Sequence, residues 1–149
     1  HAAHGEVADV VTDLGGIGVD EGHHREAALG FYREAFETNP DSRECGFQIV
    51  ALAHESDQPE IVGLYLESVQ ALYLQHTQGG DARPQDLFRL GALHLVRGEN
   101  DQAVAAYQRA VGVCGKLKGV ICPWARSEAR RLARVGSFDI REIEEVLET

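Results

Sequence analysis

Histidine and cysteine are the residue types in this sequence that could bind a metal ion or supply a nucleophile. The chain holds seven histidines and three cysteines among its 149 residues. His23 and His24 are adjacent, so on a helix they would point to different sides and could not easily share one ion. Cys114 and Cys122 could bind metal or form a disulfide, but their spacing matches no common pattern of zinc ligands. We therefore favour buried thiols and predict no metal site and no cofactor.

Three further residues were considered for chemistry. His54 and His94 occupy equivalent positions in two predicted helices, where they could line a shared groove or hold a metal ion together. The alternative that we favour is two half-buried histidines that each pack against the following helix. Cys45 lies early in a predicted helix, where the helix N-terminus could lower the pKa of its thiol. No base is near it in the sequence, so it is a candidate nucleophile that lacks a nearby base.

The glycine-rich stretch at residues 15–22 is the segment that looks most like a phosphate loop. It fails the G-x-G-x-x-G spacing, and no Lys-Ser or Lys-Thr pair follows it, so a flexible helix end is the better interpretation. The sequence also contains no G-x-S-x-G, no H-E-x-x-H and no EF-hand loop. We therefore predict a protein that is not an enzyme.

A stripe of arginines forms the one basic motif of the chain. Arg126, Arg130 and Arg134 fall on one face of a predicted helix, where they could bind phosphate or acidic groups. The interpretation that we favour is a solvated face paired with the acidic residues 139–148. A third possibility is that the stripe meets the acidic half of another copy, which would give a homo-oligomer with head-to-tail contacts.

Charge is distributed unevenly along the chain. The formal net charge is −10: residues 1–80 carry −11, with three arginines against fourteen acidic residues, and residues 81–149 carry +1. Such a surface repels nucleic acid and would suit a basic peptide or a basic patch on another protein, although a simply solvated acidic surface is the commoner explanation. No apolar run approaches the ~20 residues that span a bilayer, so we predict no membrane segment.

Residues 84–115 form the segment around which the other elements are arranged. Two amphipathic patterns lie there back to back, with apolar residues three and four positions apart in each. The break between them, residues 97–100, is short enough only for a tight antiparallel turn. We therefore predict a helical hairpin, whose first helix carries Leu87, Leu90, Leu93 and Leu95 and whose second carries Ala103, Val104, Tyr107, Ala110 and Val111.

The spacing of these residues resembles one tetratricopeptide repeat (TPR), a helical hairpin with a period of about 34 residues. The matching positions are Leu90, Gly91, Gly98, Ala103, Tyr107 and Ala110. Two positions depart from the family pattern, because Gly115 replaces the usual proline and Leu87 the usual aromatic residue. The resemblance implies a scaffold in which similar hairpins stack side by side.

Two other hairpins are predicted upstream. Residues 5–40 repeat the pattern, with Leu14-Gly15, Gly22, Ala28, Tyr32, Ala35 and Asn39-Pro40 at the corresponding places. Residues 41–78 form a divergent hairpin with helices at about 43–54 and 60–76, and Asp41-Ser42 is a plausible N-cap for the first. The helix at 60–76 is long and apolar, so we expect it to lie centrally and to be buried on two sides.

The remaining residues are expected to cap the array. Residues 116–122 are predicted to be a fraying helix end or an irregular connection, followed by a helix from Pro123 to about Val135. A short last helix at 139–147 would be capped by Ser137 or Asp139. Capping helices at about 123–149 complete an all-α fold of about three hairpins in a short right-handed superhelix with a concave face.

The resemblance also implies which residues face that groove, because the first helix of each TPR hairpin lines it. The expected groove residues are Gln48 and Leu52 from the middle hairpin and Gln85, Phe88, Arg89, Ala92, Leu95 and Val96 from the third. Arg89 matches a cation that holds a carboxylate in the members that bind chaperone tails. The companion Lys and Asn residues of that clamp are replaced here by Gln85, Thr12 and Gly16.

The predicted function is protein–protein interaction, with a peptide or helix of a partner held in the groove by apolar anchors such as Phe88. The alternative is self-assembly through the acidic front and the arginine stripe, and a nucleic-acid adaptor is the third possibility. We expect a cytoplasmic adaptor of bacterial type with free thiols. The chain begins with His1 and contains no Met, so we also expect it to be processed or excised from a longer one.

Overall fold

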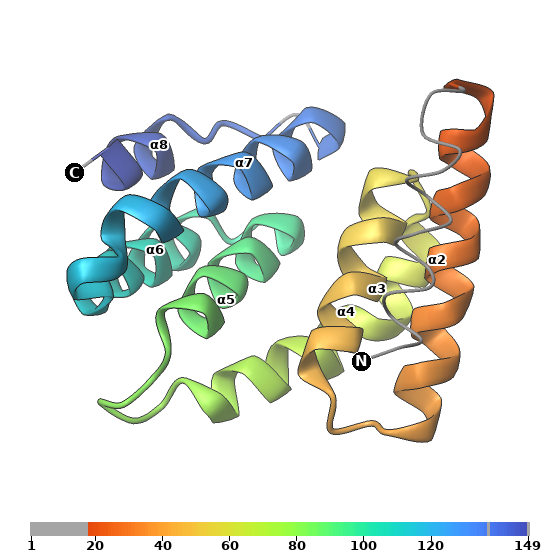
Figure 1. Cartoon of the computed structure of the whole chain (residues 1–149), viewed down its shortest axis with the longest axis horizontal. Coiled ribbons are helices and arrows are strands. Elements are labelled where there is room, and N and C mark those ends of the chain that lie inside the picture. Colours follow the sequence, from red (N-terminus) through yellow and green to blue (C-terminus); the bar gives the residue numbers. More distant parts are fainter. Residues whose placement is uncertain (1–17, 137, 149) are drawn as a thin grey trace.

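A computed structural model describes residues 18–136 and 138–148. Helices account for nearly all of the described residues, and no strand occurs among them (Figure 1). The elements, in chain order, are α2 (Gly18–Thr38), α3 (Arg43–Glu55), α4 (Pro59–His76), α5 (Pro84–Arg97), α6 (Asn100–Cys114), the 3-10 turn η1 (Gly115–Leu117), α7 (Lys118–Gly136) and α8 (Arg141–Glu148). The all-α prediction is confirmed.

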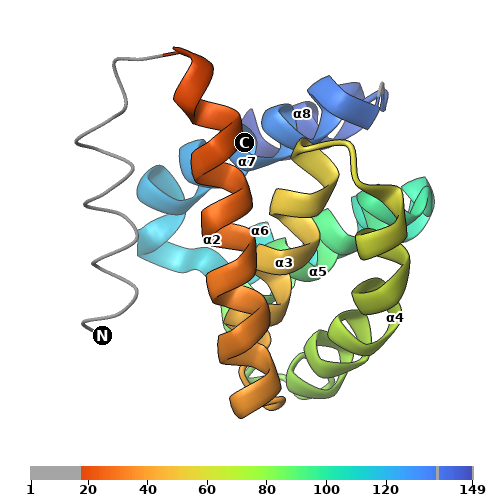
Figure 2. The ribbon, with the colours of Figure 1, turned by 90° about the vertical axis from the view of Figure 1, so that its right-hand side faces the viewer.

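The helices form two groups that meet along α3, α4, α5 and α7. Figure 1 shows α2 and α3 on one side and α5 to α8 on the other; α4 runs from the first group toward α5, and α7 extends across toward α3. Neighbours in the sequence pack together as α2–α3, α3–α4, α4–α5 and α5–α6. The turned view in Figure 2 shows α4 and the connection between α6 and α7 on opposite sides of the molecule.

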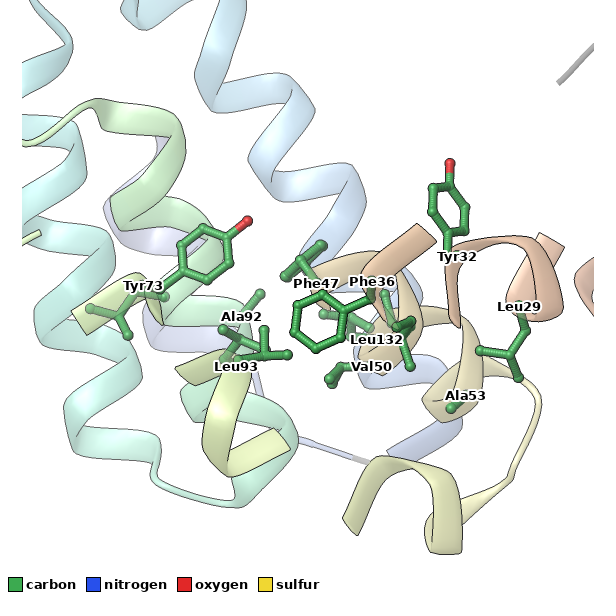
Figure 3. Close-up of a cluster of buried hydrophobic side chains, with 14 of the residues drawn as sticks. Leu29, Tyr32, Phe36, Phe47, Val50, Ala53, Tyr73, Ala92, Leu93 and Leu132 are labelled. Atoms are coloured by element: carbon green, nitrogen blue, oxygen red, sulfur yellow. The ribbon is translucent and has the colours of Figure 1, made fainter. Parts of the chain in front are cut away.

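Two clusters of buried apolar side chains hold these groups together. The first contains aromatic residues of α2, α3 and α4, and Leu132 of α7 is part of it as well. Figure 3 shows Phe47 in this cluster beside Val50 and Leu93. The second cluster joins α5, α6, α7 and α8. Because α7 contributes side chains to both clusters, it ties the two groups of helices into one core.

The α5–α6 hairpin is closely packed, as the small residues predicted. A Cβ atom added at Gly91 would lie 2.7 Å from ring atoms of Tyr107, so only glycine lets the two helices approach this closely. Gly98 ends α5 with φ 83°, in the left-handed region that glycine adopts without steric cost. The predicted tight turn is therefore confirmed, with its glycine in the conformation that a helix C-terminus favours.

The α3–α4 hairpin matches its predicted boundaries, but α4 does not lie centrally. Ser42 caps α3, and its hydroxyl accepts the backbone N–H of Cys45 at 3.4 Å. The prediction that α4 is buried on two sides is wrong, because only Val69, Gln70 and Tyr73 of this helix are buried. Leu64 is 69% exposed, so an apolar sequence here produces an outward apolar face.

Two other boundaries differ from the prediction. Gly22 lies inside α2 and not at a hairpin turn, because the helix already begins at Gly18. Residues 118–122, predicted to be a fraying helix end or an irregular connection, are helical, and Pro123 lies inside α7. Proline removes a single backbone N–H there, while Cys122, Ala125 and Leu132 bury their side chains along the same helix. Residues 5–17, the first part of the hairpin predicted at residues 5–40, lie outside the described residues.

Candidate functional site

A pocket of about 480 Å³ opens between α2, α3 and α5. Its walls come from the end of α2, from the turn that follows it and from the first turns of α3 and α5. Polar side chains provide most of its lining, with one cation and one carboxylate among them. The lining residues are Tyr32, Asn39, Ser42, Glu44, Cys45, Gln48, Gln85 and Arg89.

Local contacts fix the two helix starts that border the pocket. The turn before α3 closes with a hydrogen bond from the Ser42 N–H to the Asn39 carbonyl at 3.1 Å. Arg43 then donates two hydrogen bonds to the Asp86 carboxylate, at 3.0 Å and 3.1 Å, and both side chains are largely buried. A bidentate pair of this kind holds two elements in one geometry. It fixes the start of α3 beside the start of α5.

Arg89 lines the pocket and is held between aromatic rings. Its guanidinium carbon lies 4.8 Å from the centre of the Phe47 ring and 5.7 Å from the centre of the Trp124 ring. Both distances suit a cation–π interaction. Its Nε is buried and makes no hydrogen bond within the described part of the chain. The aromatic rings and the buried Tyr73 therefore hold the Arg89 side chain in place at the pocket wall.

Arg89 also changes the titration of a buried tyrosine beside it. Burial raises the pKa of Tyr73 to about 12, and the nearby Arg89 guanidinium partly opposes that shift. In Tyr32, at the edge of the pocket, burial and the Cys45 thiol raise the pKa, and Arg89 again acts in the opposite direction. The cation thus acts on one tyrosine buried in the core and on one that lines the pocket.

A buried carboxylate lies on α7, about one helical turn after Trp124. Glu128 of α7 is 3% exposed, and its Oε1 has no hydrogen-bond partner among the described residues. Burial raises the pKa of Glu128 to about 7; Arg89 and Arg131 lower it, and Glu55 raises it further. A buried carboxyl group that lacks hydrogen-bond partners usually has a raised pKa, because burial makes its charged form unfavourable.

The pocket brings together three of the predicted groove residues. Gln48, Gln85 and Arg89 all line it. Leu52 is instead half-buried against the first apolar cluster. Val96 lines a smaller hollow of about 220 Å³, together with His54.

The prediction is wrong for the other three groove residues. Phe88, Ala92 and Leu95 are 0%, 0% and 1% exposed, so no partner can touch them. The cause is α7, which packs against α5 and reaches α3. The Trp124 ring lies edge-on to Phe88, with 6.4 Å between ring centres. The chain's own helix therefore fills this part of the expected groove, which stays open beside Arg89 and in the smaller hollow beside Val96.

Two members of the predicted arginine stripe are engaged inside the chain. Arg130 donates from Nε to the Glu144 carboxylate at 2.7 Å, and Arg126 donates to the Leu147 carbonyl at 3.2 Å. Both partners belong to α8, as the paired interpretation expected. Arg134 is exposed.

The two equivalent histidines have separate structural contacts. His54 Nε2 lies 2.8 Å from the Leu132 carbonyl oxygen, and its ring stacks on Phe138. His94 Nδ1 lies 2.8 Å from the carboxylate of Glu99, which directly precedes α6. The two therefore share no groove. Across residues 18–136 and 138–148, no three His, Cys, Asp or Glu side chains are grouped to hold a metal ion.

Sequence reasoning missed five residues of the pocket, and part of the signal was present. The N-cap at Ser42 and the Asn39-Pro40 turn both mark the place where α2 turns into α3. Tyr32 and Cys45 complete the wall there, and Glu44 adds its only carboxylate. A turn joining two helices brings its flanking residues together, but the side-chain directions depend on how α2 packs.

No described helix is long and apolar enough to cross a membrane.

Comparisons with family models, with curated proteins and with solved structures find no match. The function therefore has to be argued from the geometry of the pocket.

Proposed function

We propose that this chain is a non-enzymatic binding module whose pocket beside Arg89 holds a segment of another protein. The observation that carries the proposal is that Gln48, Gln85 and Arg89 converge on one open pocket of about 480 Å³. This volume lies within the range of pockets that hold small ligands or a few side chains.

The lining suits polar recognition of a peptide. The amides of Gln48, Gln85 and Asn39 can each donate and accept hydrogen bonds, as the backbone of an extended peptide requires. Arg89 adds a cation to the pocket wall, which favours a carboxylate of the partner. Because Phe88 is buried, we no longer propose it as an apolar anchor.

We also propose that α3 to α6 are two TPR-like hairpins in a short array. The support is the spacing of residues 84–115, the close approach at Gly91 and the left-handed Gly98. We propose that the chain acts as an adaptor in the cytoplasm, because its three cysteines are free, as is usual in a reducing compartment.

A displayed library of short random peptides, selected on the immobilised full chain, tests the pocket. We expect the double variant Gln48→Ala with Gln85→Ala to weaken selected peptides at least about tenfold, since each lost hydrogen bond costs about 1 kcal/mol. The matched control is Gln102→Ala with Gln108→Ala, which removes two exposed amides from α6. Equal binding by both double variants would reject the pocket as the binding site.

Self-association is a second candidate, favoured by an exposed apolar corner. Val113, Leu117 and Val120 are 42%, 54% and 73% exposed where α6 turns into α7, and two lysines lie between them in the sequence. The exposed face of α4 on the opposite side of the molecule presents Leu64 between Glu60 and Glu67 (Figure 2). Apolar groups with opposite charges around them would let one copy dock on the next.

Sedimentation at low and high salt tests the second candidate. Because salt screens charged contacts between exposed groups, we expect association at low salt that weakens as salt is added. Val120→Asp should abolish it, and Val135→Asp, another exposed valine of α7, is the control. A monomer at every salt concentration would reject self-association.

A further inference from the structure

Arg89 lines the pocket, where a ligand would meet it, and it also contacts α7. Its guanidinium carbon lies 5.7 Å from the centre of the Trp124 ring, and Glu128 follows Trp124 by about one turn on the same face of α7. Arg89 is also the first of the two cations that lower the pKa of the buried Glu128. No ion pair within 4.0 Å joins the two side chains in the described structure, so Glu128 does not hold the guanidinium tightly. One cation can therefore act on both the pocket and Glu128.

Glu128 is surrounded by groups from every helix group packed around α7. Tyr107 of α6 feels its charge, since Glu128 raises the pKa of that buried phenol further. From α3, Glu55 acts as a like charge, and it is itself paired with Arg131 at 3.6 Å. On the α8 side, Glu144 is paired with Arg130. Among these groups, Arg89 is the one that also lines the pocket.

We propose that binding of an acidic group of the partner against Arg89 is coupled to uptake of a proton by Glu128. The inference rests on the proposed function of the pocket. The acidic group is a carboxylate, from either an acidic side chain or the C-terminus of the partner. When it binds, its negative charge offsets the field of Arg89 at Glu128, and the buried carboxylate becomes easier to protonate.

The direction of the pH effect follows from linkage. Because burial raises the pKa of Glu128 to about 7, this carboxyl group titrates in the neutral range in the free protein. If binding raises the pKa of Glu128, protonation must strengthen binding by the same factor, because coupling between two sites is reciprocal. Affinity should therefore fall as pH rises through neutrality. Each unit by which binding raises the pKa gives about a tenfold change over the full titration.

Binding of the selected peptides at pH 6 and pH 8 tests the coupling. For the unmodified chain we expect several-fold tighter binding at pH 6. Glu128→Gln keeps the side chain neutral at both pH values, so it should bind at pH 8 as tightly as the unmodified chain does at pH 6. Glu142→Gln, which removes an exposed carboxylate from α8, is the matched control and should keep the pH dependence. Each peptide is used with a free and with an amidated C-terminus, which distinguishes the two sources of the carboxylate.

The outcomes separate this inference from the proposed function. If peptides bind but affinity is unchanged between pH 6 and pH 8, the coupling is rejected and the binding module stands. If neither form of any peptide binds, both are rejected.

A second measurement guards against a Gln variant that fails to fold. The carboxyl carbon of Glu128, followed by NMR in the unmodified chain, should titrate near pH 7 and shift to higher pH when peptide is added. An unshifted midpoint in the presence of bound peptide would overturn the coupling.

Discussion

The α5–α6 and α3–α4 hairpins are built from similar helices but bury very different shares of them. α6 packs against α5 and is covered again by α8, whereas the outward face of α4 has no such cover from the described residues. The glycines at the interfaces differ as well. In α5, Gly91 lies in mid-helix against Tyr107, and in α3, Gly46 lies near the helix start against Val69 and Phe36.

The positions of the two glycines show where the helices of each hairpin come close together. A glycine in mid-helix lets two helices approach over most of their length, and Gly98 then closes the turn without steric cost. The α3–α4 turn instead places Asp57, a non-glycine residue, at φ 55°. The four comparisons below test whether these features cause the difference, from the largest expected effect to the smallest.

Leucine truncations should show the contrast most strongly. Leu93 of α5 is 0% exposed, and Leu93→Ala should lower the free energy of unfolding by about 2–5 kcal/mol because it leaves a cavity. Leu64→Ala in α4 should change it by less than about 0.5 kcal/mol, since that side chain is mostly in solvent. Urea unfolding followed by circular dichroism measures both. A costly Leu64→Ala would instead indicate that a second copy covers α4.

The buried carboxylate on the α5–α6 side should make stability depend on pH. The folded-state pKa of Glu128 is raised from 4.5 to about 7, so its charged form opposes folding and stability should fall as pH rises between these values. Glu128→Gln should therefore gain on the order of 3 kcal/mol over the unmodified chain at pH 8 and little at pH 4. Unfolding at several pH values measures this gain, and one that does not change with pH would contradict the assignment.

Alanine at two helical glycines should act in opposite directions. Gly91→Ala forces a Cβ to within 2.7 Å of the Tyr107 ring and should destabilise the fold by about 1–3 kcal/mol. At Gly63 of α4 a Cβ meets nothing within 4 Å, so Gly63→Ala should stabilise by up to about 1 kcal/mol through helix propensity. Thermal or urea unfolding gives both signs. If Gly63→Ala also lowered the stability, the added methyl group would have to meet other atoms, contrary to the open space around Gly63.

The two hairpin turns should give the smallest contrast. Gly98→Ala places a side chain at φ 83° and should cost about 1 kcal/mol. Asp57→Gly relieves a left-handed residue but adds flexibility to the unfolded chain, so the net change should stay within about 0.5 kcal/mol. Paired urea unfolding curves measure the difference. Equal effects would mean that the turns do not distinguish the hairpins.

Local patterns in the sequence predicted the helices but not how deeply each is buried. The boundaries of α3 to α6 follow from caps, prolines and apolar periodicity, all of which act within a few residues. The exposure of Leu64 and the burial of Phe88 depend on where α7 packs, and no local pattern states that. The apolar pattern of α4 would be the same with or without another helix packed on its outer face. The pattern therefore predicts a central position for α4 that the helix does not have.

The candidate site was predicted in part for the same reason. Gln48, Gln85 and Arg89 were identified because helices of equivalent hairpins present equivalent positions to one side. Phe88 and Leu95 were assigned to that side too, but α7 covers them. The role of Glu128 could not be predicted, because a glutamate among arginines in an amphipathic helix is usually solvated.

Trp124 gives the protein a spectroscopic probe of its own. It is the sole tryptophan of the chain, and its indole lies against the Arg89 guanidinium that a ligand would contact. Indole emission responds to neighbouring charge, so a carboxylate arriving at Arg89 would change the intensity or wavelength of the fluorescence. Titrations of unlabelled ligands could thus be followed by light alone, without a dye attached anywhere near the pocket.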